Sequence, residues 1–278
     1  MDQRRMCPHC RAFITVKDKV CPYCNERVGP RATELRDAGA TIGGFIPHAR
    51  FVTMIILVIN FGLYLATVLY SQSTAQGGNF MTLDMRTLFA FGAKYRAAII
   101  GYGQWWRLVT AGFLHGGLLH IGMNSWVLYD LGAQVEEVYG VSRLLVIYFM
   151  ATVCGFLLST FWSTALSVGA SAGIMGLIGA MIALGVRERS SAAAAANRGN
   201  YIRWVVYMLI FGIVLPGIDN AAHIGGLAAG FGVAYVAGTP RVQSFWTERL
   251  WRVSGAACVV ITAACFLMMY LWFSRNAQ

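Results

Sequence analysis

A serine and a histidine stand out in this sequence because each lies in a long apolar stretch. Ser171 follows a Gly-Ala pair, and His223 lies between two alanines and the sequence Ile-Gly-Gly. Polar groups inside membrane spans are costly and usually face a protein interior or a water-filled cavity. In such a cavity Ser171 can act as a nucleophile that loses its proton to His223, which later donates it to a departing amine. The pair therefore predicts cleavage of a peptide bond.

A second polar cluster can stabilise the negative charge that develops in such a reaction. His120 and Asn124 are four residues apart, so on a helix they project from one face. Their side chains can donate hydrogen bonds to an oxyanion, as can the backbone N–H groups beside Ser171 where this serine begins a helix. We therefore predict His120 and Asn124 as oxyanion residues and Ser171 and His223 as the catalytic pair.

Each pattern taken singly has a simpler explanation. A serine near a helix start is commonly a cap, a lone intramembrane histidine is commonly structural, and glycines spaced by four are commonly a packing device. His115, His120 and His223 could instead converge as three metal ligands, as in a transporter of metal or small solutes. The sequence contains no His-Glu-x-x-His motif and no aspartate pair in facing spans. These patterns disfavour an intramembrane metalloprotease and an intramembrane aspartyl protease.

Four cysteines near the N-terminus form a separate candidate site. Cys7 and Cys10 make one Cys-x2-Cys pair, and Cys21 and Cys24 make another after ten intervening residues. Four thiolates at this spacing can bind one structural Zn²⁺ in a tetrahedral site that has no open position for a water. The alternatives are two disulfides, unligated thiols, or His9 in place of one cysteine. We predict an all-cysteine zinc ribbon with a short strand between the two pairs.

The composition indicates what must position these residues. Hydrophobic residues make up 57% of the 278 residues and charged residues only 12%, and the mean hydropathy is +0.57. A soluble globular enzyme is excluded, since about a quarter of the residues of an ordinary soluble domain are charged. A membrane-spanning helix needs about 20 mostly apolar residues. Seven stretches are candidates: residues 51–70, 113–135, 144–168, 170–186, 202–216, 221–237 and 253–273. The alanine-rich residues 190–200 are expected in a loop or in an extension of the fourth span.

Positive charges are distributed unevenly among the segments that connect these spans. The chain has 22 Lys and Arg against 12 Asp and Glu, a net charge of +10. If the N-terminus is cytoplasmic, 17 of the 22 basic residues lie on the cytoplasmic side and five on the other. Because basic residues favour the cytoplasmic side, this predicts a multi-pass membrane protein with its N-terminus in the cytoplasm and its C-terminus outside. The basic excess then needs no nucleic acid, and none is expected as a partner.

This orientation places the candidate residues at one depth. The second, fourth and sixth spans all begin on the outer side, and their first residues include His120, Ser171 and His223, respectively. We therefore expect the three polar clusters to meet near the outer membrane face. The cysteine pairs lie on the opposite, cytoplasmic side, where a reducing environment favours zinc over disulfides.

Together and in order, these motifs resemble those of the rhomboid intramembrane serine proteases. The resemblance covers about residues 45–240 and differs from the family at Ala172 and Met175, where members usually have a glycine and many have an aromatic residue. The matching residues are Gly169, Ala170 and Ser171; Ala222, His223, Gly226 and Gly230; His115, His120 and Asn124; Trp106 and Arg107; and Gly132, Glu136 and Gly140.

The resemblance implies an all-α membrane protein with a six-helix rhomboid core. It implies that Ser171 and His223 form a catalytic dyad without an acidic third member. His120 and Asn124 would join the Ser171 backbone N–H in the oxyanion hole, and no cofactor would take part in catalysis. The implied substrates are transmembrane proteins, cut within or just outside the bilayer where their helices unwind easily, since a helical peptide bond is shielded by its own hydrogen bonds.

The same resemblance implies roles for residues outside the catalytic cluster. Trp106 and Arg107 would stabilise the loop before the second span, and Glu136 would tie down the cytoplasmic end of that span. The seventh span resembles the six-plus-one arrangement of some members. The expected domains are a cytoplasmic zinc-ribbon module at residues 1–28, a linker at 29–44, the protease core at 45–240, and the seventh span with the C-terminal tail at 241–278.

An intramembrane serine endopeptidase is the function that these residues favour. The alternative is a non-catalytic rhomboid-like protein that binds and routes membrane-protein clients. Such relatives typically lack the serine or the histidine, whereas this chain has both Ser171 and His223. For the zinc module we expect a docking or regulatory role, and the sequence does not identify its partner.

Overall fold

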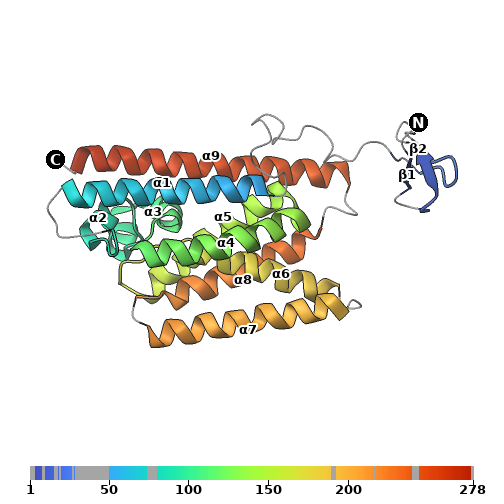
Figure 1. Cartoon of the computed structure of the whole chain (residues 1–278). Helices are drawn as coiled ribbons and strands as arrows, with labels where there is room; N and C mark the ends of the chain where they lie inside the picture. Colours follow the sequence, from blue (N-terminus) through green and yellow to red (C-terminus); the bar gives the residue numbers. More distant parts are fainter. Residues whose placement is uncertain are drawn as a thin grey trace. The chain divides into compact units, whose positions relative to one another are not determined.

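A computed structural model of the chain describes residues 4–7, 10–15, 18, 20–26, 28, 50–73, 80–188, 192–215, 217–239 and 244–276. The chain divides into two compact units, residues 1–51 and 52–278. Two short strands belong to the first unit, and the long helices make up the second (Figure 1). The expected linker at residues 29–44 lies outside the described residues.

The N-terminal unit is built around its cysteines. Strand β1 (Arg4–Met6) pairs antiparallel with β2 (Phe13–Thr15), and Met6 lies opposite Phe13. β2 lies between the two cysteine pairs, as predicted, but its partner strand precedes the first pair. The buried core consists of Cys7, Ile14, Cys21 and Val28. So small a core cannot stabilise a fold by apolar burial alone, and such modules usually depend on a metal or disulfides.

The larger unit is a helical bundle whose main helices correspond one to one with the seven predicted stretches. They run side by side in Figure 1, which confirms the predicted all-α architecture of six helices plus one. In the described part of the chain, the long helices are α1 (Phe51–Ser73), α4 (Leu118–Tyr139), α5 (Val141–Trp162), α6 (Ser171–Arg187), α7 (Ala192–Val214), α8 (Asn220–Ala237) and α9 (Phe245–Asn276).

A structured loop connects α1 to α4. It contains α2 (Met85–Ala90), a π-helical turn (Ala97–Gly101), α3 (Arg107–Thr110) and a 3-10 turn (Ala111–Phe113). We call residues 80–117 the first loop. Its short helices let the chain satisfy most of its own backbone polar groups while it lies against the bundle.

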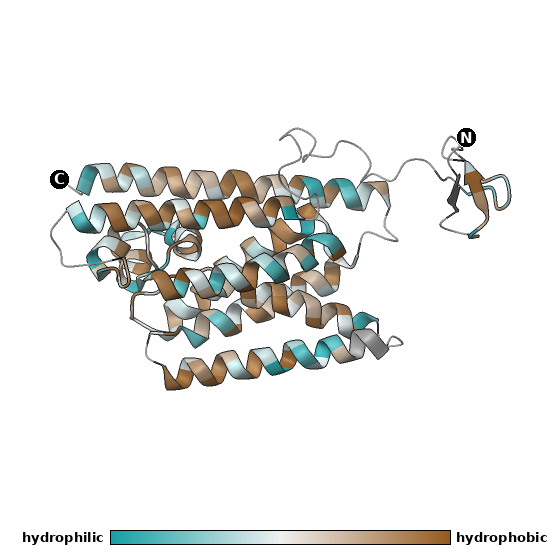
Figure 2. Cartoon of the chain, viewed as in Figure 1, coloured by the Kyte–Doolittle hydropathy of each residue, from teal (hydrophilic) through white to brown (hydrophobic). Residues whose placement is uncertain are grey.

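The bundle has the apolar exterior of a membrane protein. Helices α1, α5 and α9 are each long and apolar enough to cross a membrane by length and composition, and α6 is a shorter apolar helix. Hydrophobic residues predominate along α1 and α9 in Figure 2, and outward-facing side chains such as Val58, Ile213 and Val260 are exposed. An apolar surface of this extent suits contact with lipid rather than water. The chain is a multi-pass integral membrane protein.

Several helix boundaries differ from the predicted ones for local reasons. α4 begins at Leu118 rather than at residue 113, because the chain bends at Gly116 and Gly117, and the Gly117 backbone is extended. α5 ends at Trp162 rather than at residue 168, and Ser163 is already extended. The alanine run is neither a loop nor an extension of the fourth span, because it begins α7. Alanine has the highest helix propensity, which explains this continuation.

The centre of the bundle is α6, which packs against α5, α8, α7 and α4. Glycines allow α6 and α8 to approach until their backbones touch. A Cβ atom on Gly226 would lie 2.2 Å from the Ala172 carbonyl oxygen, and one on Gly230 would lie 2.2 Å from the Gly176 carbonyl oxygen. The predicted packing role of these glycines therefore agrees with the structure. Close contact is what allows a short serine side chain on α6 to reach a histidine on α8.

Glu136 joins the end of α4 to the start of α1. Its carboxylate accepts hydrogen bonds from the backbone N–H groups of Val52 and Thr53, both at 3.1 Å, and from the Thr53 hydroxyl at 2.8 Å. The Glu136 side chain is 4% exposed. A carboxylate at a helix N-terminus satisfies orphan N–H groups and interacts favourably with the helix dipole. The structure thus supplies the tie that was expected of Glu136.

Candidate active site

Ser171 and His223 face one another across the contact between α6 and α8. Ser171 is the first residue of α6, and His223 lies in the first turn of α8. The Ser171 Oγ atom and the His223 Nε2 atom are 2.9 Å apart, within hydrogen-bond distance. His223 is 3% exposed, whereas Ser171 is half-buried. A buried base thus contacts a hydroxyl that a reagent can approach.

The hydrogen-bonding pattern of His223 favours a two-residue arrangement. Its Nδ1 atom is buried and has no hydrogen-bond partner among the described residues. When the ring proton is on Nδ1, Nε2 is free to accept the Ser171 hydroxyl proton, which is the direction that a general base requires. Within the described part of the chain, no carboxylate binds Nδ1 as the aspartate of a three-residue charge system would.

His120 lies directly beside the serine. A Cβ atom on Gly169 would lie 2.8 Å from His120 Nε2 and 3.4 Å from Ser171 Oγ, so both side chains border the same small space above Gly169. Gly169 has a φ of 140°, which strongly favours glycine. The Gly116 backbone N–H donates to His120 Nδ1 at 3.3 Å. In neutral His120 the proton is then on Nε2, where it can be donated toward the serine.

Backbone donors lie in the same place. The first backbone hydrogen bond at the start of α6 runs from the Ile174 N–H to the Ala170 carbonyl. The N–H groups of Ser171, Ala172 and Gly173 therefore have no acceptor within their own helix. Together with His120 they provide donors on the side of Ser171 where an oxyanion would form.

Asn124 is positioned less directly than predicted. It lies one turn after His120 on α4 and is 8% exposed, but its Nδ2 atom donates to the His120 carbonyl oxygen at 2.8 Å. This hydrogen bond uses one of the two N–H donors of the amide. No hydrogen bond joins Asn124 to Ser171 in the described structure, so Asn124 would reach an oxyanion only through its second N–H or after rotation.

The three histidines do not form a metal site in the described structure. His115 packs edge to face on His120, with ring centroids 5.1 Å apart, and it is 1% exposed. Among the described residues, the four N-terminal cysteines are the group of three or more possible ligands whose atoms converge. His115 therefore acts in this structure as a packing partner of His120.

Arg107 organises the first loop from a fully buried position. Its Nη1 atom donates to the carbonyl oxygens of Phe89 at 2.7 Å and Ala93 at 3.0 Å, and its Nε donates to Gln104 at 2.6 Å. The neighbouring Trp106 is 5% exposed. These contacts agree with the loop-stabilising role expected of Trp106 and Arg107.

Two residues that support the site were missed by the sequence analysis. Lys94 is fully buried and its Nζ atom donates to the carbonyl oxygens of Ser163 and Ala165, at 2.9 and 3.0 Å. Asp219 caps α8 by accepting from the Ala222 N–H at 3.0 Å, and it also accepts from the Ser159 hydroxyl. An aspartate just before an apolar helix is a recognisable capping signal. A lysine in a loop gives no such signal, because most are solvated.

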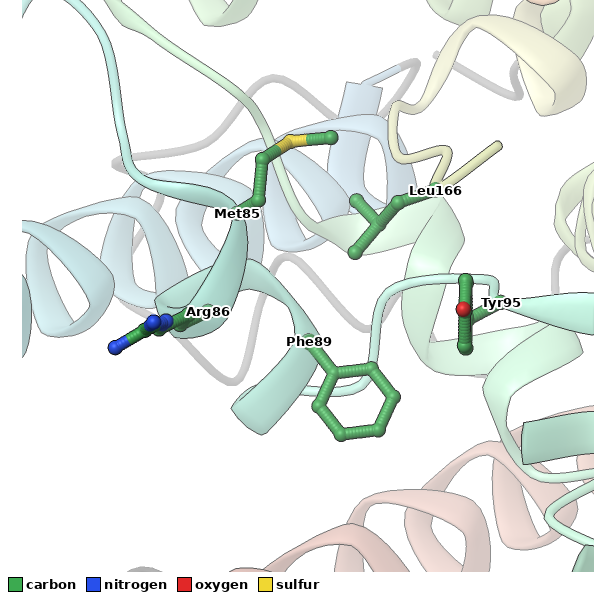
Figure 3. Close-up of a pocket in the computed structure, with 5 residues that line it drawn as sticks. All are labelled: Met85, Arg86, Phe89, Tyr95 and Leu166. Carbon is green, nitrogen blue, oxygen red and sulfur yellow. The ribbon is translucent and has the colours of Figure 1, made fainter. Parts of the chain in front are cut away.

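A shallow pocket of about 310 Å³ lies where the first loop meets the segment between α5 and α6 (Figure 3). Its lining consists of Met85, Arg86, Phe89, Tyr95 and Leu166. Neither Ser171 nor His223 belongs to it. Its wall is largely apolar, and the Arg86 side chain points away from the other four in Figure 3. The pocket therefore marks the junction of two loops rather than the reaction site.

The four predicted zinc ligands converge in the N-terminal unit. The Cys7 and Cys24 sulfurs are 3.7 Å apart, those of Cys10 and Cys21 are 3.6 Å apart, and all four lie within 4.8 Å of one another. A tetrahedral site with Zn–S distances of about 2.3 Å separates its sulfurs by roughly 3.8 Å, whereas a disulfide requires about 2.05 Å. The donor set and its spacing therefore fit Zn²⁺.

The two cysteine pairs share one backbone geometry. The Cys7 carbonyl accepts from the Arg11 N–H at 3.0 Å, and the Cys21 carbonyl accepts in the same way from the Asn25 N–H at 2.9 Å. A backbone hydrogen bond with Glu26 lowers the pKa of the Cys24 thiol, but burial and the three neighbouring thiols raise it to about 12. A bound cation would offset this mutual repulsion of thiolates.

Comparison with known proteins places this architecture and site in one family. A family model described as the Rhomboid domain matches residues 102–240. The chain is 36% identical to the rhomboid protease GluP of Bacillus subtilis, over 70% of this chain and 37% of that protein. It is 32% identical to the mitochondrial RHOMBOID-like protein 6 of Arabidopsis thaliana, over 61% of this chain and 55% of that protein.

A third relative matches along almost its whole length. Rhomboid-like protease 1 of Toxoplasma gondii is 26% identical over 91% of this chain and 90% of that protein. The chain spans little more than a third of the Bacillus protein and about half of the Arabidopsis protein. The bundle, its serine and histidine, and the matched domain define a multi-pass rhomboid-type membrane protein. This chain belongs to the rhomboid family.

Proposed function

We propose that this protein is an intramembrane serine endopeptidase that hydrolyses peptide bonds of transmembrane proteins. The observation that carries the proposal is the 2.9 Å contact between Ser171 Oγ and the Nε2 atom of the buried His223. Relatives named as proteases support the same activity. A serine is a weak nucleophile by itself, so the adjacent base is the feature that makes the chemistry possible.

The reaction proceeds in two halves. His223 Nε2 takes the Ser171 proton as Oγ attacks the scissile carbonyl carbon, and the C–Oγ bond forms. The resulting oxyanion accepts hydrogen bonds from the Ser171 N–H and from His120 Nε2–H, and Asn124 contributes through its second N–H. The C–N bond then breaks, and His223 donates its proton to the leaving amine. A water molecule, deprotonated by His223, hydrolyses the acyl-enzyme and restores Ser171.

We propose that this site opens toward the outer face of the membrane. The uneven distribution of Lys and Arg supports a cytoplasmic N-terminus, and α4, α6 and α8 then all begin on the outer side. Substrate helices would be cut near that face, where they unwind readily and expose a peptide bond. A small residue before the cut would suit the confined space above Gly169.

We propose the domain arrangement that the sequence predicts: a zinc-ribbon module at residues 1–28, a linker at 29–44, a protease core at 45–240 and a seventh helix beyond. The sulfur spacing supports Zn²⁺ held by Cys7, Cys10, Cys21 and Cys24 as a structural ion. When bound, the ion would cross-link the two cysteine pairs. The module would act in docking or regulation and would have no part in the hydrolytic steps.

A cleavage assay tests the proposed activity. The full-length protein is reconstituted in liposomes with a panel of single-span model substrates, and the products are identified by mass spectrometry. The wild-type protein should cleave within or next to the span, and Ser171→Ala should be inactive, because loss of the nucleophile removes on the order of 10³-fold or more in rate. Ser125→Ala is the matched control, since the Ser125 hydroxyl is buried with no hydrogen-bond partner among the described residues.

The competing function is a non-catalytic protein that binds membrane clients. It predicts that the wild-type protein and Ser171→Ala bind the same substrates and that neither cleaves them. Equal cleavage by the wild type and Ser171→Ala would contradict both functions as stated, because another group would then have to supply the nucleophile.

A further inference from the structure

The guanidinium of Arg107 lies among three aromatic rings, and one of them comes from the other end of the chain. The Arg107 Cζ atom lies 4.2 Å from the Phe89 ring centroid, 4.6 Å from that of Trp106 and 5.0 Å from that of Trp272. Phe89 and Trp106 belong to the first loop, whereas Trp272 belongs to α9. The seventh helix therefore completes the enclosure of a buried cation.

Trp272 contributes to this site because hydrogen bonds satisfy only part of the Arg107 guanidinium. The Nε and Nη1 atoms of Arg107 donate to loop acceptors, but its Nη2 atom is buried with no hydrogen-bond partner in the part of the chain that the structure describes. A cation held over aromatic faces is stabilised most strongly where water is excluded. The aromatic rings, including that of Trp272, therefore offset the cost of burying the Nη2 side of the guanidinium without a hydrogen bond.

Further aromatic contacts join the end of α9 to the first loop. Phe273 packs edge to face on Phe91, with ring centroids 5.3 Å apart, and Trp272 packs on Phe89 at 5.6 Å. Closer to the middle of α9, Phe266 packs on Phe113, with ring centroids 5.4 Å apart. Aromatic pairs of this geometry each add stabilisation beyond the area they bury.

The opposite end of α9 is fixed as well. Arg143 on α5 donates to both carboxylate oxygens of Glu248, at 2.6 and 3.1 Å, and Arg143 is 2% exposed. Trp272 lies 24 residues after Glu248, or roughly 36 Å along a helix. A continuous helix that is anchored at Glu248 also fixes the position of its other end along the helix axis. The Trp272 ring is therefore held beside Arg107.

The first loop in turn holds the backbone that leads to Ser171. Arg107 donates to the carbonyl oxygen of Ala93. Lys94, which follows Ala93, exchanges two backbone hydrogen bonds with Ser167, both at 3.0 Å. The Gly169 N–H donates to the Ala111 carbonyl at 2.9 Å. The segment just before the nucleophile is thus bonded to the first loop at two points, and Figure 3 shows the side chains where these loops meet.

We propose that α9 is a positioning element for the active site: through Trp272 it holds Arg107, and through the loop that Arg107 organises it fixes the backbone preceding Ser171. The inference rests on the proposed role of Ser171 as nucleophile. It assigns the seventh helix a task in catalysis although, among the described residues, no hydrogen bond or ring contact joins α9 to Ser171 or His223. A displacement of about 1 Å at a reacting group can cost up to ~10²-fold in rate, so a remote support of this kind has a measurable effect.

The test compares three variants of the full-length protein in lipid nanodiscs. Trp272→Leu keeps an apolar side chain but removes the aromatic face, and Trp272→Phe retains a ring over Arg107. Tyr270→Leu is the matched control, since Tyr270 lies on the same helix and is 62% exposed. Three quantities are measured: the second-order rate constant for labelling of Ser171 by a fluorophosphonate, hydrogen exchange of backbone amides in residues 85–113, and the melting temperature.

Trp272→Leu should slow Ser171 labelling by about tenfold and increase exchange in the first loop, because a misplaced nucleophile reacts more slowly. Trp272→Phe should recover most of the wild-type rate, and Tyr270→Leu should behave as the wild type. If Trp272 only stabilised the fold, the rate of Ser171 labelling in Trp272→Leu and Trp272→Phe would fall in proportion to the fall in melting temperature. That result, or unchanged labelling and exchange in Trp272→Leu, overturns the inference.

The two proposals fail in different ways. If the wild-type protein is not labelled at Ser171, the proposed function fails, and the exchange measurement still decides whether Trp272 holds the first loop. If the wild-type protein is labelled and Trp272→Leu is labelled at the same rate, the positioning role of α9 fails and the proposed function stands.

Discussion

Replacing Glu136 with alanine tests how the start of α1 is held in the bundle. The buried Glu136 carboxylate accepts three hydrogen bonds from Val52 and Thr53, so its removal leaves two backbone N–H groups and one hydroxyl without that acceptor. Each buried donor left unsatisfied costs about 1–3 kcal/mol. The Thr53 hydroxyl can rotate to another acceptor, so the two N–H groups dominate, and we expect a loss of about 4 kcal/mol in stability. For a domain of this size that corresponds to a fall of roughly 10 °C in melting temperature.

The assay is thermal unfolding of the purified protein in detergent, followed by intrinsic fluorescence. Glu136→Gln keeps one carbonyl acceptor and should lose about half as much stability as Glu136→Ala. Glu137→Gln is the matched control, because Glu137 is the exposed neighbour on the same helix. The reasoning is refuted if Glu136→Ala melts within about 2 °C of the wild type, or if Glu137→Gln lowers the melting temperature as much.

Three further predictions follow from the contacts of single residues. Gly226→Ala should destabilise the bundle by at least about 1–3 kcal/mol, measured by thermal unfolding, because the new Cβ would lie 2.2 Å from a backbone oxygen of α6. His120→Ala should lower the rate constant of cleavage by about 10²- to 10³-fold with little change in KM, because it removes a donor to the oxyanion. Cys21→Ser should abolish stoichiometric zinc in the purified protein, measured by elemental analysis, because an all-cysteine site loses one of its four ligands.

Each of these predictions has its own control and its own contradicting result. Gly232→Ala on the same helix meets no atom within 4 Å and should leave stability unchanged or raise it, so equal melting of the two glycine variants would contradict the packing argument. A His120→Ala variant with wild-type kcat would remove His120 from the oxyanion hole. Zinc that persists at full stoichiometry in Cys21→Ser but is lost from Cys258→Ser would place the ion elsewhere in the chain.

The proposed catalytic residues could be picked out from the sequence because apolar surroundings make polar residues conspicuous. Ser171 and His223 were recognisable by that contrast, and their spacing along the chain placed them at the starts of two spans. Periodicity could not show that the Ser171 and His223 side chains meet, since the meeting depends on the backbone contact at Gly226. The side-chain direction of Asn124 was likewise inaccessible, because a hydrogen bond to the His120 carbonyl turns it along its own helix.

The connection between α1 and α4 was the least predictable part of the fold. Its short helices begin at local signals such as the Asp84 cap, which accepts from the Thr87 N–H at 2.8 Å, but hydropathy alone reads the segment as a loop. Lys94 illustrates the limit, because its burial is compensated by two carbonyl groups 69 and 71 residues away in sequence, at Ser163 and Ala165. Contacts of that range are fixed by tertiary packing, and no local pattern encodes them.

The proposed reaction requires that Ser171 is a nucleophile activated by His223. Its most direct test is labelling of the full-length protein with a fluorophosphonate, followed by mass-spectrometric identification of the modified residue in the wild type and in His223→Ala. The 2.9 Å contact predicts modification of Ser171 in the wild type and loss of that modification in His223→Ala. An unmodified Ser171 in the wild type, or equal modification of Ser171 in both proteins, would contradict activation of Ser171 by His223.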